Sequence, residues 1–301
     1  MNNPVCPLEP SAVPHGAPRP VGPSLPRRRL ASLAALLGAG ALASCAPRTN
    51  PEVPKDPLSE LPASLWNGTT LEDLLAAPMS EEHMDKAQWE AREVTPAHAE
   101  AAREEFARYL EAAYLKPQEM QGKSSEQQLA YLLKFTPEGW KSELESAFKN
   151  QEQAPFAAIL APPLQYIGTP RLAIDWYLTE GKIAVPQLVG GGTVAWSVVN
   201  PETNHVGVYA VQFAMNTGIY NSGIVPFQTF ATVIAGVDLC ATKEAGGATV
   251  PLMQPEGQHK TLRTHTLEMI VKNPQIPLED LMNPYSDRFD GRTAPVVNDC
   301  R

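Results

Sequence analysis

The stretch Leu172–Val199, LAIDWYLTEGKIAVPQLVGGGTVAWSVV, decides the fold, because it contains the densest run of strand-forming residues in the chain. Val, Ile, Thr and aromatic residues dominate it, and Gly and Pro interrupt it. We expect three strands here, over Leu172–Leu178, Lys182–Val189 and Thr193–Val199. Gly190–Gly192 leads into a strand and lacks the Lys-Ser/Thr of a phosphate loop, so we interpret it as a hairpin turn.

Residues typical of strands also dominate the sequence after Val199, in contrast to the segment that precedes this stretch. Further strands are expected over the ranges His205–Met215, Phe227–Val237 and Lys260–Val271. A short helix is expected at Pro277–Met282. Helices followed by a run of neighbouring strands indicate an α+β fold, in which N-terminal amphipathic helices pack on a curved antiparallel β-sheet.

Three amphipathic helices are expected between Thr95 and Gln151. Thr95-Pro96 has the cap and first-turn proline of a helix start, and apolar residues then recur at helical spacing. Ser125 with Gln128 resembles a capping box before a second helix, and Thr136-Pro137 opens a third. Upstream, Leu65–Ala77 is expected to hold a short helix with Thr70 as its cap.

The order of these elements, over Thr95 to Val271, resembles the cone of the nuclear transport factor 2-like fold. The resemblance implies an α+β cone with an inner cavity. It lies in element order and not in a residue motif, and the segments around Tyr220–Pro226 and Glu244–Gly257 are extra relative to that family. The family includes enzymes and inert binding modules, so the fold alone assigns no chemistry.

An export signal precedes the folded part. Arg27–Arg29 come before Leu30–Ser44, an uncharged run of 15 residues that is too short for a bilayer span. Leu42-Ala43-Ser44-Cys45 resembles the lipobox of bacterial lipoproteins, including small actinobacterial ones, which implies a lipid on Cys45 and cleavage before it. An ordinary cleaved signal is the alternative. The arginines partly match a twin-arginine signal, so export through either the unfolded or the folded route stays open.

Four segments follow from this interpretation. Residues 1–44 are a signal peptide with a Pro-rich start, 45–94 a lipidated tether and surface-wrapping segment, 95–273 the α+β domain, and 274–301 a C-terminal tail. The protein is then expected on the extracytoplasmic face of the cell membrane. Cys240 and Cys300 are left after lipidation of Cys45, and an oxidising compartment favours a disulfide between them over two free thiols or a zinc site.

Charge and motifs exclude several functions. The chain has a formal net charge of −9, and removing residues 1–44 takes away four arginines and one glutamate, leaving −12. Nucleic acid is therefore not an expected partner, since phosphate binding requires clustered basic residues. No Gly-x-Ser-x-Gly motif occurs, and neither a cofactor nor a metal site is expected. His259 with His265, and a calcium-like run from Asp287 to Gly291, both lack further ligands.

The remaining candidates form one hypothetical pocket. Aromatic strand residues are expected on the concave face of the sheet, and Asp175 with His265 is the one candidate acid–base pair. The candidate pocket residues are Asp175, Trp176, Trp196, Tyr209 and His265. Two functions remain: a non-catalytic binding or protein-interaction module whose ligand is an envelope protein or a small apolar molecule, and a small-molecule carrier or enzyme using the cavity.

Overall fold

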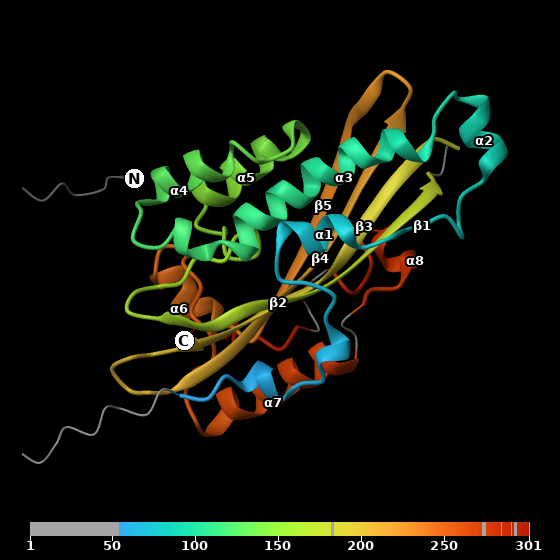
Figure 1. Ribbon diagram of the computed structural model, residues 1–301. Helices are drawn as coiled ribbons and strands as arrows, with labels where there is room; N and C mark the ends of the chain where they lie inside the picture. Colours follow the sequence, from blue (N-terminus) through green and yellow to red (C-terminus); the bar gives the residue numbers. More distant parts are fainter. Residues whose placement is uncertain are drawn as a thin grey trace, which may run out of the picture. The chain divides into compact units, whose positions relative to one another are not determined.

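Five strands form one mixed sheet in the computed structural model (Figure 1). The structure describes residues 54–181, 184–272, 275–283, 285–289, 291 and 294–300, without the side chains of 223–228. The strands, in sheet order, are β1 Met79–Ser80, β2 Gln165–Glu180, β3 Pro186–Val199, β4 Val206–Tyr220 and β5 Gly223–Ala235. The α+β class is confirmed. The sheet is not purely antiparallel as expected, because β1 pairs with β2 in parallel while β2 to β5 form an antiparallel meander.

The hairpin expected at Gly190–Gly192 is wrong, because β3 runs straight through these residues. Gly190 pairs with Trp176 of β2 and with Met215 of β4, so the three glycines lie inside the sheet. A Cβ at Gly190 would overlap the indole ring of Trp176, and one at Gly191 would overlap a methyl group of Leu281. Glycine therefore provides space for packing on both faces of the strand.

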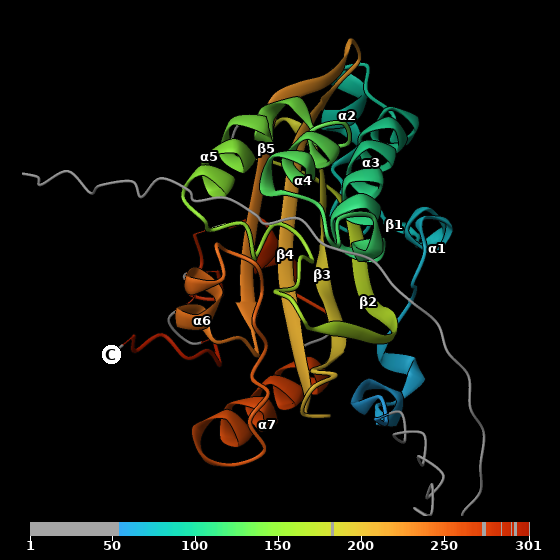
Figure 2. The same ribbon diagram turned by 90° about the vertical axis from the view of Figure 1, so that its left-hand side faces the viewer.

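The N-terminal helices pack on one face of the sheet, with α3, α4 and α5 gathered there (Figures 1 and 2). The α-helices of this half are α1 Leu71–Ala76, α2 Lys86–Ala91, α3 Pro96–Leu110, α4 Ser125–Leu132 and α5 Lys141–Lys149. Short turns are η1 Pro57–Glu60, η2 Ala63–Leu65, the π-helical turn η3 Glu111–Leu115, η4 Pro117–Glu119 and η5 Glu138–Trp140. The three helices expected after Thr95 are confirmed, the third as η5 followed by α5.

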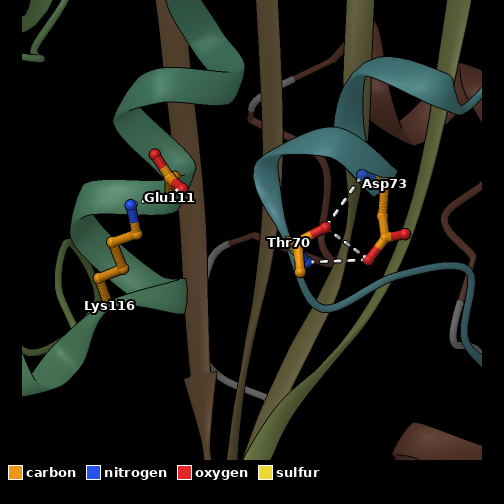
Figure 3. A network of polar contacts seen from close by, with 4 residues as sticks. All are labelled: Thr70, Asp73, Glu111 and Lys116. Carbon is orange, nitrogen blue, oxygen red and sulfur yellow. Dashed lines mark hydrogen bonds and ion pairs between the residues drawn. The ribbon is translucent and has the colours of Figure 1, made fainter.

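Helix starts follow side-chain caps. Thr70 and Asp73 form a reciprocal capping box at α1, in which the Thr70 Oγ1 hydroxyl donates to Asp73 Oδ2 at 2.8 Å (Figure 3). Figure 3 also shows Glu111 and Lys116, an ion pair of 2.8 Å at the end of the α3–η3 helix. The second capping box lies one residue earlier than expected, with Ser124 as the cap and Gln127 as its partner.

The opposite face carries the C-terminal helices α7 Gly257–Lys272 and α8 Leu278–Leu281, whereas α6 Leu239–Glu244 follows β5 and packs through Leu239 against the core under the N-terminal helices. The strand expected at Lys260–Val271 is wrong, since this segment is α7. Leu262, Thr266 and Ile270 recur every four residues, and Thr266 and Ile270 are fully buried. The short helix expected at Pro277–Met282 is confirmed as α8.

The two ends of the described chain pack against this body. In the segment before Thr95, Leu58, Leu74 and Trp89 are at most 1% exposed, so they belong to the core. At the other end, Cys240 and Cys300 form a disulfide, as expected. The export signal and Cys45 lie outside the described residues. Within the described part of the chain, every helix is too short or too polar to cross a bilayer.

Candidate ligand cavity

A cavity of about 980 Å³ lies on the sheet face that carries α7 and α8. β4, β5, α7, α8's C-terminal flank and the tail supply its walls. The described lining residues are Gln212, Val233, Leu262, His265, Met269, Asp280, Asn283, Tyr285, Ser286, Asp287, Arg288, Ala294 and Pro295. This volume is in the range of small-molecule sites in proteins.

A hydrogen-bonded chain of polar side chains crosses one wall of the cavity. The Arg288 Nε donates to Asp280 Oδ2 at 2.8 Å, and Arg288 Nη1 donates to the amide oxygen of Gln212 at 3.4 Å. Gln212 in turn donates from Nε2 to the hydroxyl of Thr193 at 3.2 Å. Gln212 is only 2% exposed, so this chain fixes the guanidinium and the carboxylate on the cavity wall.

A second wall is apolar and comes from α7 and β5. Leu262, His265 and Met269 follow one another at spacings of three and four residues, which places them on one side of α7. Val233 of β5 faces the same cavity and is buried. The cavity therefore combines an apolar side with a fixed polar side, as ligand sites commonly do.

The tail wall is held in place by backbone pairing and by the disulfide. The amide of Gly236 donates to the carbonyl of Pro295 at 2.9 Å, and the amide of Val297 donates to the carbonyl of Val237 at 3.0 Å. Three residues further on, the disulfide fastens Cys300 to Cys240. Because Pro295 lines the cavity, the disulfide acts as a clamp on this wall.

Asp175 and His265 do not share this cavity. His265 is an exposed residue of α7 that lines it, whereas Asp175 of β2 is absent from the described lining. Asp175 is half-buried, accepts a hydrogen bond from Gln275 Nε2 at 3.5 Å, and has its pKa raised by burial. The geometry gives the pair no common site for a substrate.

The aromatic residues expected in the pocket fill the core on the other face. Trp176, Trp196 and Tyr209 are at most 1% exposed. The indole nitrogen of Trp176 donates to the carbonyl of Leu74, and that of Trp196 donates to the carbonyl of Tyr114, both at 3.1 Å. The rings of Trp196 and Tyr209 stack with centroids 4.7 Å apart. Their polar atoms and faces are thus occupied by protein.

A smaller cavity of about 480 Å³ touches this core at the start of β2. Tyr166 and Trp196 line it together with Gln118 and Gln121. The Tyr166 and Tyr209 hydroxyls lie 3.0 Å apart, and burial raises the pKa of both phenols, so neither titrates near neutral pH. These groups stabilise the core as neutral hydrogen-bonding side chains.

Histidines and acids in the described ranges do not gather into a metal site, since no group of three or more could hold an ion there. His259 lies beside Asp238, with Nε2 3.8 Å from Oδ2, and not beside His265. Both histidines are on α7, six residues apart, so they point in different directions around the helix. Part of the calcium-like run, Asp290, lies outside the described residues.

Sequence reasoning missed most of the cavity. Asp280 and Arg288 are eight residues apart, but Gln212 lies 76 residues before Arg288, and only the tertiary structure brings it to them. One signal was available: Gln212 is the only polar side chain in the apolar run Val208–Met215 apart from the Tyr209 hydroxyl. A buried polar residue in such a run requires a partner.

Comparison of the chain with protein-family models, curated proteins and solved structures gives no match.

Proposed function

We propose that this protein is a membrane-tethered lipoprotein of the extracytoplasmic face, whose folded part acts as a non-catalytic binding or protein-interaction module of the cell envelope. The cavity of about 980 Å³ carries the binding part of this proposal, because it is large, partly apolar and lined by fixed polar groups. The order of basic, apolar and small residues before Cys45 supports the tether. The disulfide supports an oxidising compartment.

The finer fold belongs to the same proposal: the helices and the antiparallel meander form a nuclear transport factor 2-like cone. Two observations support it. The helices precede the long strands in the chain, and α3 lies against the inner aromatic face of the sheet. The inner face is filled by Trp176, Trp196 and Tyr209, so the ligand site is expected on the other face of the sheet.

A lipid anchor makes membrane association depend on a single side chain. Two acyl chains on Cys45 hold a protein at a membrane at about 0.8 kcal/mol per buried methylene group, without a spanning helix. We expect the full chain, expressed in a lipoprotein-processing bacterial host, to incorporate radiolabelled palmitate and to sediment with membranes.

Cys45→Ala is the decisive variant, and Cys6→Ala is its matched control, since both remove one cysteine upstream of the folded part. Cys45→Ala should lose the label and the membrane association, while Cys6→Ala should keep both. A Cys45→Ala protein that retains the label would overturn the tether.

A small-molecule carrier is the second candidate, because His265 lines the cavity. An enzyme of the same fold would in addition need Asp175, which lies outside the described lining. Two variants of the full chain, Asp175→Asn and His265→Ala, distinguish an enzyme from a non-catalytic binding module. Each is tested for its ability to complement an envelope phenotype of the deletion strain. If both variants complement like the parent, the enzyme is excluded. Loss in both variants, with normal thermal unfolding, would favour it over the binding module.

A further inference from the structure

An exposed aromatic ring stands at the edge of the cavity. Tyr285 is 89% exposed, and Val271, at 42%, is the other large apolar side chain found exposed among the described residues. Every other described Tyr, Phe and Trp side chain is at least partly covered. An uncovered ring costs hydration free energy in the free protein and offers a flat apolar surface to a ligand.

The polar groups beside Tyr285 include both hydrogen-bond donors and acceptors. The Asp280–Arg288 pair supplies a carboxylate and a guanidinium, and Asn283 supplies an amide whose oxygen accepts from the Tyr285 backbone amide at 3.3 Å. Planar groups of this kind place two polar atoms side by side and can bind two neighbouring hydroxyl groups of a ligand.

One further polar group in this wall lacks a partner. The Ser286 hydroxyl is buried and has no hydrogen-bond partner in the part of the chain that the structure describes. Ser286 lines the cavity. A buried hydroxyl without a partner is unfavourable, and rotation about the Cα–Cβ bond of Ser286 towards the cavity would let it hydrogen-bond to a ligand hydroxyl.

The charges of the lining favour a neutral ligand. Asp280 and Arg288 neutralise one another at 2.8 Å, and Asp287 is the further carboxylate of the described lining. An anion would face two carboxylates and a guanidinium that is already paired. A cation would find only Asp287 in the described lining, whose exposed carboxylate is screened by water and therefore attracts it weakly.

We propose that this cavity binds a neutral carbohydrate, with a sugar ring packed on Tyr285 and its hydroxyl groups hydrogen-bonded to Asn283, Ser286 and the Asp280–Arg288 pair. The inference deepens the proposed binding function and rests on it. Leu262 and Met269 on the apolar wall would cover the carbon face of a second sugar ring.

Ligand-detected saturation-transfer NMR on the full chain in detergent tests the proposal directly. The probes are glucose, galactose, N-acetylglucosamine and maltotriose, with choline as the cation and inorganic phosphate as the anion. We expect at least one sugar to receive saturation and choline and phosphate to receive none. Titration calorimetry with the sugar that binds then gives its Kd.

Variants locate the binding. Tyr285→Ala should weaken the affinity at least about tenfold, while Tyr285→Phe, which keeps the ring, should stay within about threefold of the parent. Val271→Ala is the matched control, since it removes the other exposed apolar side chain and should leave the Kd unchanged. Because Tyr285 is exposed, these variants are expected to fold, and an unchanged unfolding temperature checks this.

Three outcomes would overturn the proposal: binding of none of the sugars, preferential binding of choline or phosphate, or sugar binding that Tyr285→Ala leaves intact. The palmitate-labelling experiment tests the lipid anchor independently of sugar binding. A chain without palmitate that still binds sugar contradicts only the anchor, whereas a labelled chain that binds no sugar contradicts only the ligand class.

Discussion

Replacing Gly192 by alanine tests the unbroken course of β3 through the sheet. A Cβ built at Gly192 overlaps the carbonyl oxygen of Ala173 and lies 2.9 Å from the Cα of Ile174, both in β2. Ala173 pairs with Thr193 and Ile174 pairs with Gly192. The atoms in the way therefore belong to the backbone of β2 where it is paired with β3. Relief therefore requires β2 and β3 to move apart.

The expected destabilisation is about 3 kcal/mol, at the upper end of overpacking costs, because backbone and not a flexible side chain is in the way. In a domain of this size that lowers the unfolding temperature by roughly 6 to 12 °C. Urea unfolding, monitored by far-ultraviolet circular dichroism and by tryptophan fluorescence, measures this loss of stability. In Gly190→Ala the new Cβ meets the Trp176 ring, and this variant should be destabilised by about 1 to 3 kcal/mol.

Gly181→Ala is the matched control. Its new Cβ meets only the end of the Gln187 side chain, which can rotate away, so the loss should stay under about 0.5 kcal/mol. In a hairpin turn at 190–192, alanine would meet no neighbouring strand. If Gly192→Ala is no less stable than Gly181→Ala, the continuous strand is refuted.

Three further changes have defined effects. Replacing Cys240 and Cys300 together by serine removes a cross-link between residues 60 apart and should destabilise the protein by about 4 kcal/mol in urea unfolding. A loss of stability below about 1 kcal/mol would show that the tail stays packed against the body without the disulfide. Thr70→Ala removes the α1 cap and should cost about 1 kcal/mol. Hydrogen bonds from Thr69 and Thr70 lower the pKa of Asp73 in the folded protein. The ionised Asp73 therefore stabilises the fold above the unfolded pKa of about 3.9, and this contribution is lost as the pH falls through the lower folded pKa. Thr70→Ala should make the stability less dependent on pH in this acidic range. Burial raises the pKa of Asp175, so its ionisation destabilises the fold as pH rises; Asp175→Asn should be at least as stable as the parent at pH 7, and lower stability there would contradict this account.

The sequence identifies the helices well because their signals are local. The Thr-Pro start of α3, the apolar spacing of α5 and the Thr70 cap each lie within a few residues of the structure that they specify. Two errors arise where local signals mislead. Three successive glycines are typical of a turn, yet here their missing side chains make room for Trp176 and Leu281.

The misassigned α7 shows a related limit. Its Thr and Val content favours a strand, but the spacing of Leu262, Thr266 and Ile270 is that of a helix, and the spacing agrees with the structure. Of the cavity residues, only His265 is predicted from the sequence, although Gln212 stands out as a polar residue in an apolar strand. Its polar wall joins Gln212 to Arg288, residues 76 positions apart, through a contact that no local pattern encodes.

The intact mass of the protein extracted from the membranes of a lipoprotein-processing host shows whether the folded module is tethered by a lipid. We expect a chain that begins at Cys45, carries a diacylglycerol on that residue, and lacks two hydrogens because of the Cys240–Cys300 disulfide. A chain that retains residues 1–44, or one that is cleaved without a lipid, would contradict the tethered module.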